Sequence, residues 1–199
     1  MAVEFKFDFP RTLAAITYIA SRSIPDLTTY KILKIIFLAD KFHLVTYGRT
    51  ITGDKYSALP DGPVPSRIYD FFKKQVLKRP FSDEGRQLLA NIAVDKTTKH
   101  PRLKAIRPYD ANALSRSDLN ALDKAIRDFG DCNYAQLKQL THETAAFNRA
   151  WENKKFFASS APMKFEDFFD DDRNAVQGAK AEMIENDQLR KVFAERRTV

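Results

Sequence analysis

Apolar residues recur every three or four positions along most of this chain, which is the period of a helix with one buried face. A first such helix follows Pro10, with Leu13, Ile16 and Ile19 on its apolar side. The same period predicts later helices after residue 65, from Ser115 to Gly130, from Asn133 through Leu140, and from about Asn174 to Glu195. Most of the chain is therefore expected to be helical.

The most apolar of these helices should lie at the centre of the fold. It begins near Thr28, whose side chain can accept a bond from a free amide of the first turn, and it stops at Gly48, which can adopt the left-handed conformation that ends helices. Apolar side chains cover most of its circumference, as expected of a buried helix. Its only water-exposed face is predicted to be the narrow stripe of Lys31, Lys34 and Lys41.

The helical period weakens in the middle of the chain, where β-structure is expected. Residues 91–94 and 103–106 are short apolar runs on either side of the polar sequence DKTTKHPR, which predicts a hairpin. The fold class is thus mainly α (α+β). Helices should surround a buried central helix, with a small β-hairpin or short sheet beside them.

Residues 47–72 hold three of the six glycines and three of the nine prolines. Gly62 precedes Pro63 and is expected to be extended, while Pro63 and Pro65 stiffen the backbone and residues 56–58 form a brief strand. Two interpretations are open. The loop is either a tight connector between core helices or a preorganised surface that docks another macromolecule at little entropic cost.

The amino-acid composition limits the classes of protein to which this chain can belong. The chain has 199 residues, of which 44% are apolar and 30% charged, which is typical of a soluble globular domain, and a single domain over residues 1–199 is expected. No segment approaches the roughly 20 apolar residues that cross a bilayer. The one cysteine, Cys132, excludes an internal disulfide framework. With no secretory signal evident at the start, a cytoplasmic location and no membrane partner are expected.

Positive charge is concentrated in one segment, residues 73–107. It contains ten basic residues against three acidic ones, which accounts for the whole formal net charge of +7. The basic residues are Lys73, Lys74, Lys78, Arg79, Arg86, Lys96, Lys99, Arg102, Lys104 and Arg107. Such a segment can attract nucleic acid or an acidic protein surface, or it can simply be a solvated face.

Signals of catalysis are weak. The chain has no GxSxG, GxxxxGK[ST] or GxGxxG motif, and its histidines lack the spacing of a zinc site. His142 and Glu143 are neighbours on a predicted helix and therefore point in different directions. Asp40, Asp54 and Asp61 can meet in space only if the fold brings them together. We therefore predict neither enzymatic activity nor a cofactor or metal, and a hydrolase that uses His142 is the weakest alternative.

Several motifs resemble those of one family. They are KIIFLAD in the central helix, YGRTI at its end, GPV at residues 62–64, and the Thr141-His142 pair followed by Trp151. Together they resemble the Panacea domain, the SocA-like antitoxin family of bacterial and phage toxin–antitoxin systems. The resemblance covers about residues 10–155, which we expect to form the antitoxin core.

The resemblance implies a largely helical, non-catalytic antitoxin that binds a cognate protein toxin and neutralises it. Toxins paired with this family have unrelated folds, and some are similar to alarmone synthetases. One branch of the family delivers its toxin to the ClpXP protease. This sequence departs from the family in the less aromatic lead SAL before PDGPV, and residues 156–199 carry no family element, so we interpret them as an acidic connector and a C-terminal helix.

Two surfaces are expected to touch the partner: the stiff loop with its possible neighbours, and the acidic segment KFEDFFDDD at residues 164–172. The latter has five acids and three aromatics in nine residues, which suits an interface with a charged rim but also a solvated connector with its phenylalanines packed down. The predicted contacts are Lys55, Tyr56, Asp61, Gly62, Pro63, Val64, Arg67, His142, Asp170, Asp171 and Asp172. Two alternative functions stay open: a nucleic-acid-binding regulator that uses the basic segment, and, as the resemblance implies, a proteolytic adaptor that delivers a toxin to ClpXP.

Overall fold

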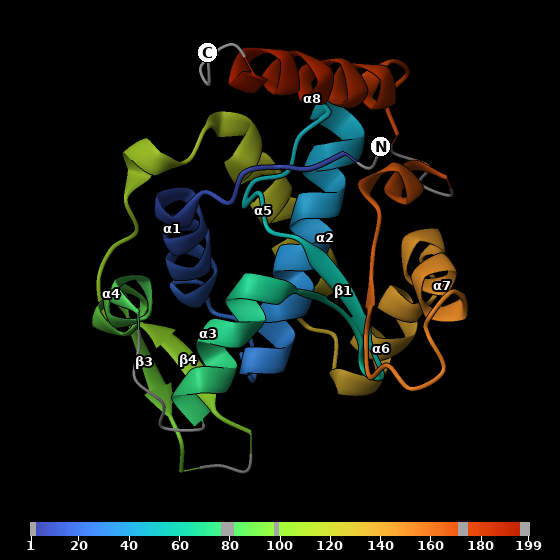
Figure 1. Cartoon of the computed structure of the whole chain (residues 1–199). Helices are drawn as coiled ribbons and strands as arrows, with labels where there is room; N and C mark the ends of the chain where they lie inside the picture. Colours follow the sequence, from blue (N-terminus) through green and yellow to red (C-terminus); the bar gives the residue numbers. More distant parts are fainter. Residues whose placement is uncertain (1–2, 77–81, 98–99, 171–174, 196–199) are drawn as a thin grey trace.

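The computed structural model describes residues 3–76, 82–97, 100–170 and 175–195 (Figure 1). These residues are 58% helical, with eight α-helices and a little β-structure, so the predicted fold class is confirmed. The helices are α1 (Phe9–Ala20), α2 (Thr29–Tyr47), α3 (Ser66–Val76), α4 (Asp83–Asn91), α5 (Arg116–Phe129), α6 (Tyr134–His142), α7 (Ala145–Glu152) and α8 (Ala179–Glu195). The strands are β1 (Tyr56–Leu59), β2 (Gly62–Pro65), β3 (Ile92–Asp95), β4 (Arg102–Ala105) and β5 (Ala161–Pro162). No helix within the described ranges combines the length and the apolar character needed to cross a membrane.

Helix α2 lies at the centre, as its apolar circumference predicts. The hydroxyl of Thr28 caps it by accepting a bond from the Lys31 amide, and Gly48 ends it with φ +67°. Helices α1, α5, α6 and α8 all pack against it, and Figure 1 shows it running through the middle of the molecule. The Thr28 and Gly48 predictions are both confirmed.

The lysine stripe of α2 is not its water-exposed face, and that prediction is wrong. Lys31 and Lys34 are buried, and the side chain of Lys34 has no exposed surface. Each ammonium instead reaches backbone carbonyls: Lys31 Nζ donates to Pro25 O at 2.6 Å and Gly130 O at 3.0 Å, and Lys34 Nζ donates to Pro63 O at 2.8 Å. These bonds supply acceptors inside the fold, which a buried ammonium requires.

The glycine- and proline-rich loop folds into part of a three-stranded antiparallel sheet in the order β2-β1-β5. Strand β1 confirms the predicted strand after residue 55, while β5 was not predicted. Gly62 is not in an ordinary extended conformation but has φ +95°. The chain reverses between Leu59 and Gly62, which pair across the turn, and a glycine at this point tolerates the positive φ that the reversal needs.

The other predicted elements also form. Strands β3 and β4 make the expected hairpin, and Ser115 and Asn133 cap α5 and α6 in capping boxes with Asp118 and Gln136. The last helix begins at Ala179, later than predicted. Residues 175–178 are not helical, and the predicted start at about residue 174 lies outside the described residues.

Candidate functional site

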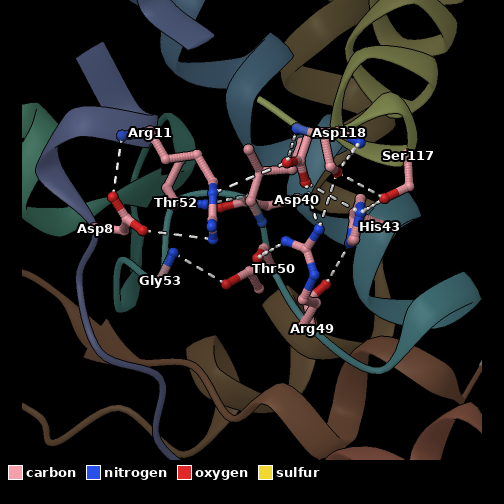
Figure 2. Close-up of polar contacts among 12 residues, drawn as sticks. Asp8, Arg11, Asp40, His43, Arg49, Thr50, Thr52, Gly53, Ser117 and Asp118 are labelled. Atoms are coloured by element: carbon pink, nitrogen blue, oxygen red, sulfur yellow. Dashed lines mark hydrogen bonds and ion pairs between the residues drawn. The ribbon is translucent and has the colours of Figure 1, made fainter. Parts of the chain in front are cut away.

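Polar side chains gather in two places, one inside the fold and one at the end of the three-stranded sheet. The first, which we call the inner polar cluster, consists of Asp40, His43, Arg49, Thr52, Tyr56, Ser117 and Asp118. Figure 2 shows all of these except Tyr56 as labelled side chains. It joins α2 to α5 and to the loop that follows α2.

Asp40 fastens this loop onto α2. Its fully buried carboxylate accepts bonds from the Ile51 amide at 2.7 Å, the Thr52 amide at 3.1 Å, the Thr52 hydroxyl, and the Tyr56 hydroxyl at 2.6 Å. Burial raises the pKa of Asp40, while these donors act in the opposite direction. Because both carboxylate oxygens are engaged by the chain itself, we assign Asp40 to holding the fold.

His43, Ser117 and Asp118 look at first like a catalytic triad, but their geometry differs from one. His43 Nε2 lies 3.0 Å from Ser117 Oγ and 3.2 Å from Asp118 Oδ1, while Nδ1 lies 2.8 Å from Arg49 O. In a triad the serine and the acid use different ring nitrogens. Burial lowers the pKa of His43 to about 4, so the neutral ring donates from Nδ1 to the Arg49 carbonyl. Arg49 also pairs with Asp118 at 2.9 Å, and the set links α2 to α5.

Asp54 caps the next helix. Its carboxylate accepts bonds from the amides of Arg67 and Ile68 at 3.0–3.1 Å, at the start of α3. Burial raises the pKa of Asp54 to about 6. Asp40 and Asp54 are therefore occupied separately, and among the described residues no three His, Cys, Asp or Glu side chains group in a way that could hold a metal ion.

The second group of polar residues lies where β1 turns into β2. Asp61, on this turn, accepts bonds from the Tyr134 hydroxyl at 2.6 Å and from Lys138 Nζ at 2.8 Å. The Tyr30 hydroxyl donates to the Asp61 carbonyl at 3.2 Å, and the Tyr30 and Tyr134 rings lie 4.6 Å apart. Hydrogen bonds from Lys138 and Tyr134 lower the pKa of Asp61. The turn is thereby fixed to α6.

Gly62, at the end of this turn, lies very close to side chains of α2 and α6. A Cβ placed on it would lie 2.8 Å from Lys34 Nζ, 2.9 Å from Thr141 Oγ1 and 3.1 Å from His142 Cδ2. Any side chain at this position would therefore force either the turn or these neighbouring side chains to shift. Lys34 is held against the Pro63 carbonyl here, and desolvation lowers its pKa to about 7. The GPV and Thr-His motifs thus meet at one point in space.

His142 lies beside Gly62 and is half-buried. Its ring stacks on Phe147 with centroids 4.2 Å apart, and Phe147 stacks on Trp151 at 5.8 Å. Nε2 is buried and has no hydrogen-bond partner among the described residues. Burial, aided by Lys138 and Lys34, lowers the pKa of His142, so the ring is neutral at pH 7. Glu143 accepts a bond from Gln139 instead, so the structure does not pair the histidine with this acid.

We call the group at the sheet end the sheet-end surface and define it as Tyr30, Asp61, Tyr134, Lys138 and His142. Sequence reasoning identified Asp61 and His142 but missed the other three. Tyr134 and Lys138 are four residues apart on a capped helix, a spacing that places them on one face. Their proximity to Asp61 could not be inferred, because more than 70 residues of chain separate them.

The remaining predicted contacts on the loop differ in exposure. Four of them are buried in or under the sheet: Tyr56, Gly62, Pro63 and Val64. They support the turn. Lys55 is exposed and pairs with Glu4 at 2.6 Å, while the guanidinium of Arg67 contacts Glu84 at 3.0 Å and lies over the Phe7 ring. Both charges are thus engaged away from the sheet-end surface.

Part of the acidic segment packs against the rest of the fold. Phe165 and Phe168 of its 3₁₀ turn (Phe165–Phe169) are buried, and Asp167 pairs with Arg149 at 2.8 Å. Asp170 contacts Arg149 and lies 3.1 Å from Lys180. Asp171 and Asp172 lie outside the described residues. A role for this segment in binding stays a prediction.

The described parts of the basic segment are the end of α3, helix α4 and the β3–β4 hairpin. Lys96, Lys104 and Arg107 are exposed there, whereas Arg102 pairs with Asp26 at 2.6 Å. Lys78, Arg79 and Lys99 lie outside the described residues, as does the side chain of Lys74. The hairpin thus presents at least three basic side chains to solvent.

Comparison with known proteins supports one family. The family model for the SocA-like antitoxins, Panacea domain, matches residues 32–148. This range runs from the first turn of α2 into α7 and includes the central helix, the turn at Asp61 and all of α6. The resemblance seen in the sequence motifs is confirmed. No curated protein and no solved structure matches the chain.

Proposed function

Because the chain belongs to the SocA-like antitoxins with a Panacea domain, we propose that it binds a cognate protein toxin and holds it inactive. Family membership supports an antitoxin role and favours a non-enzymatic one. The inner polar cluster is consistent with this, since its carboxylates and its histidine are occupied in joining α2, α5 and the loop. We propose a stoichiometric complex in which the antitoxin covers or distorts the toxin's active site.

The sheet-end surface is the contact region that the geometry supports best. Tyrosine side chains next to charged groups are common at the centres and rims of protein interfaces. Tyr134 is half exposed, yet its hydroxyl is already fixed by Asp61. A surface held in place before binding loses little conformational entropy in the complex. The stiff loop thus acts as both a connector and a support for this surface.

A pocket of about 460 Å³ adjoins the sheet-end surface, between the start of α2 and α6. Tyr30 and Tyr134 belong to both, and Pro25 and Leu137 contribute apolar walls. Its size suits one or two side chains of a partner. We propose that the toxin places an apolar side chain here.

The class of toxin is a further proposal, which rests on the family alone. A toxin similar to alarmone synthetases acts on nucleotides, and its site would be basic. The acidic segment would then compete for that site, and Asp170 would exchange Arg149 and Lys180 for cations of the toxin. The experiment that tests the function itself does not depend on this class.

The test is co-expression with the product of the adjacent gene. We expect that product alone to stop growth, that co-expression restores growth, and that the two proteins purify as one complex. If the adjacent product is toxic but this chain neither restores growth nor binds it, the antitoxin function is wrong.

Two further activities are proposed as alternatives. Delivery of the toxin to ClpXP would make toxin levels fall in wild-type cells but not in cells that lack the protease. Nucleic-acid binding is favoured by Lys96, Lys104 and Arg107 on the hairpin. It would show as an affinity for DNA or RNA that falls steeply with salt concentration.

A further inference from the structure

The turn that follows α7 exposes two adjacent aromatic side chains. Phe156 is 89% exposed and Phe157 96%, the highest values among the exposed large apolar side chains of the described residues. The Ala158 amide donates to the Lys155 carbonyl at 2.9 Å and closes the turn, so the two phenylalanines occupy its central positions. Their rings meet edge to face, with centroids 4.9 Å apart. Two aromatic rings held together in water indicate an interaction site.

The side chain of Lys154 stabilises this turn. Its Nζ donates to the Ala158 carbonyl at 2.7 Å and lies 5.4 Å from the centre of the Trp151 ring. Trp151 in turn stacks on Phe147, and Phe147 on His142 of the sheet-end surface. Lys154 therefore links the exposed turn to an aromatic row that leads back to that surface.

Strand register places the turn at the same end of the sheet. β5 runs antiparallel to β1, with Ala161 opposite Ala58 and Pro162 opposite Ser57. Residues just before Ala161 therefore lie towards the β1–β2 turn, which carries Asp61. Two independent observations, the register and the aromatic row, thus bring the phenylalanine pair to the sheet-end surface.

We propose that Phe156 and Phe157 are the apolar anchor of the antitoxin's contact with its toxin, and that they enter an apolar cleft bordered by carboxylates. The charges around the turn specify this partner. Between residues 152 and 160, Lys154 and Lys155 stand against one acid, Glu152. A desolvated aromatic centre inside a charged rim is the usual anatomy of a tight protein interface. This inference rests on the proposed antitoxin function.

A protein partner fits the turn better than a lipid surface. Anionic membranes attract lysine and phenylalanine together. However, three exposed acids belong to the neighbouring segments: Glu143 directly after α6, Glu152 at the end of α7, and Asp61 on the β1–β2 turn. Anionic lipid headgroups would repel these carboxylates, whereas a protein partner can place cations opposite them.

The experiment compares two double substitutions. Phe156→Ser with Phe157→Ser removes the anchor, and Val192→Ser with Phe193→Ser removes similarly exposed apolar side chains from α8, where Val192 is 45% and Phe193 60% exposed. The probe is the purified product of the adjacent gene, titrated by calorimetry, with thermal unfolding of each variant as a folding check. We expect the first variant to bind at least about 30-fold more weakly than wild type at an unchanged Tm. We expect the α8 variant to bind within about threefold of wild type, because α8 lies outside the proposed interface.

The outcomes separate this inference from the proposed function. If wild type and the phenylalanine variant bind and neutralise the toxin equally, the anchor is wrong and the antitoxin function stands. If wild type does not bind at all, both are wrong. Two further results also overturn the anchor: self-association of wild type that the variant loses, and flotation of wild type but not the variant with phosphatidylglycerol vesicles, each at unchanged toxin affinity.

Discussion

The inner polar cluster and the sheet-end surface contain similar residues but serve different purposes. Each contains a half-buried or buried histidine whose pKa burial lowers, His43 in one and His142 in the other. Both ring nitrogens of His43 contact polar groups of the chain, while Nε2 of His142 has no partner among the described residues. The side chains of the inner polar cluster hold elements together, whereas Asp61 and Tyr134 of the sheet-end surface are exposed to solvent and therefore accessible to a partner.

The largest effect is expected inside the fold. Asp40→Ala leaves two amides and two hydroxyls without their acceptor, and it should lower the free energy of unfolding by about 4 kcal/mol. Urea denaturation measures this. Asp70→Ala, at an exposed position of α3, is the control and should change stability by less than about 0.5 kcal/mol. A loss below about 1 kcal/mol at Asp40 would contradict the assigned role.

Gly62→Ala should destabilise the protein by about 3 kcal/mol, since the new Cβ meets Lys34 and Thr141 and the residue keeps a positive φ. Gly178→Ala is a matched control because Gly178 has nearly the same φ, +94°, with nothing within 4 Å of the added Cβ. It should cost about 1 kcal/mol, the backbone effect alone. If urea denaturation shows equal losses in the free energy of unfolding for the two variants, close packing at Gly62 does not contribute to stability.

Lys34 should make stability depend on pH. Its pKa is about 7 in the folded chain and about 10.5 when unfolded, so between these values the unfolded state binds more protons and stability rises with pH. From pH 7 to pH 9 the wild type should gain about 2 kcal/mol relative to Lys34→Met. Urea denaturation at both pH values gives this difference, in which groups common to the two proteins cancel. Parallel changes in the two proteins would show that Lys34 is not desolvated as described.

The smallest effect on stability is expected at the sheet-end surface. Asp61→Asn breaks an exposed pair with Lys138 and should change the free energy of unfolding by less than about 0.5 kcal/mol. Asp128→Asn, which breaks the comparable Lys124 pair on α5, should do the same. Only Asp61→Asn should weaken toxin binding, by about tenfold. Similar affinities for the two variants would remove Asp61 from the interface.

Local sequence signals predicted the helices well. Thr28, Ser115 and Asn133 are caps because their side chains bond amides only three residues away, and such signals are contained in the sequence itself. Gly62 shows where a local rule fails. The extended preference of a residue before proline was overridden by the reversal between β1 and β2, which only glycine tolerates easily.

Contacts between distant segments could not be predicted. Lys34 is buried because the Pro63 carbonyl lies opposite it, and no helical pattern reveals that acceptor. The two-residue strand β5 is too short to have a period, yet it places the Phe156–Phe157 turn at the sheet end. Of the candidate site, the sequence indicated the stiff loop and His142, while Tyr30, Tyr134 and Lys138 emerged only from packing.

The most direct test of the account is amide hydrogen exchange of the antitoxin, alone and saturated with the product of the adjacent gene. The account predicts new protection in residues 57–62, 134–143 and 152–160, with none gained in the β3–β4 hairpin or in α8. Protection confined to the hairpin or α8, with the sheet end unchanged, would contradict it.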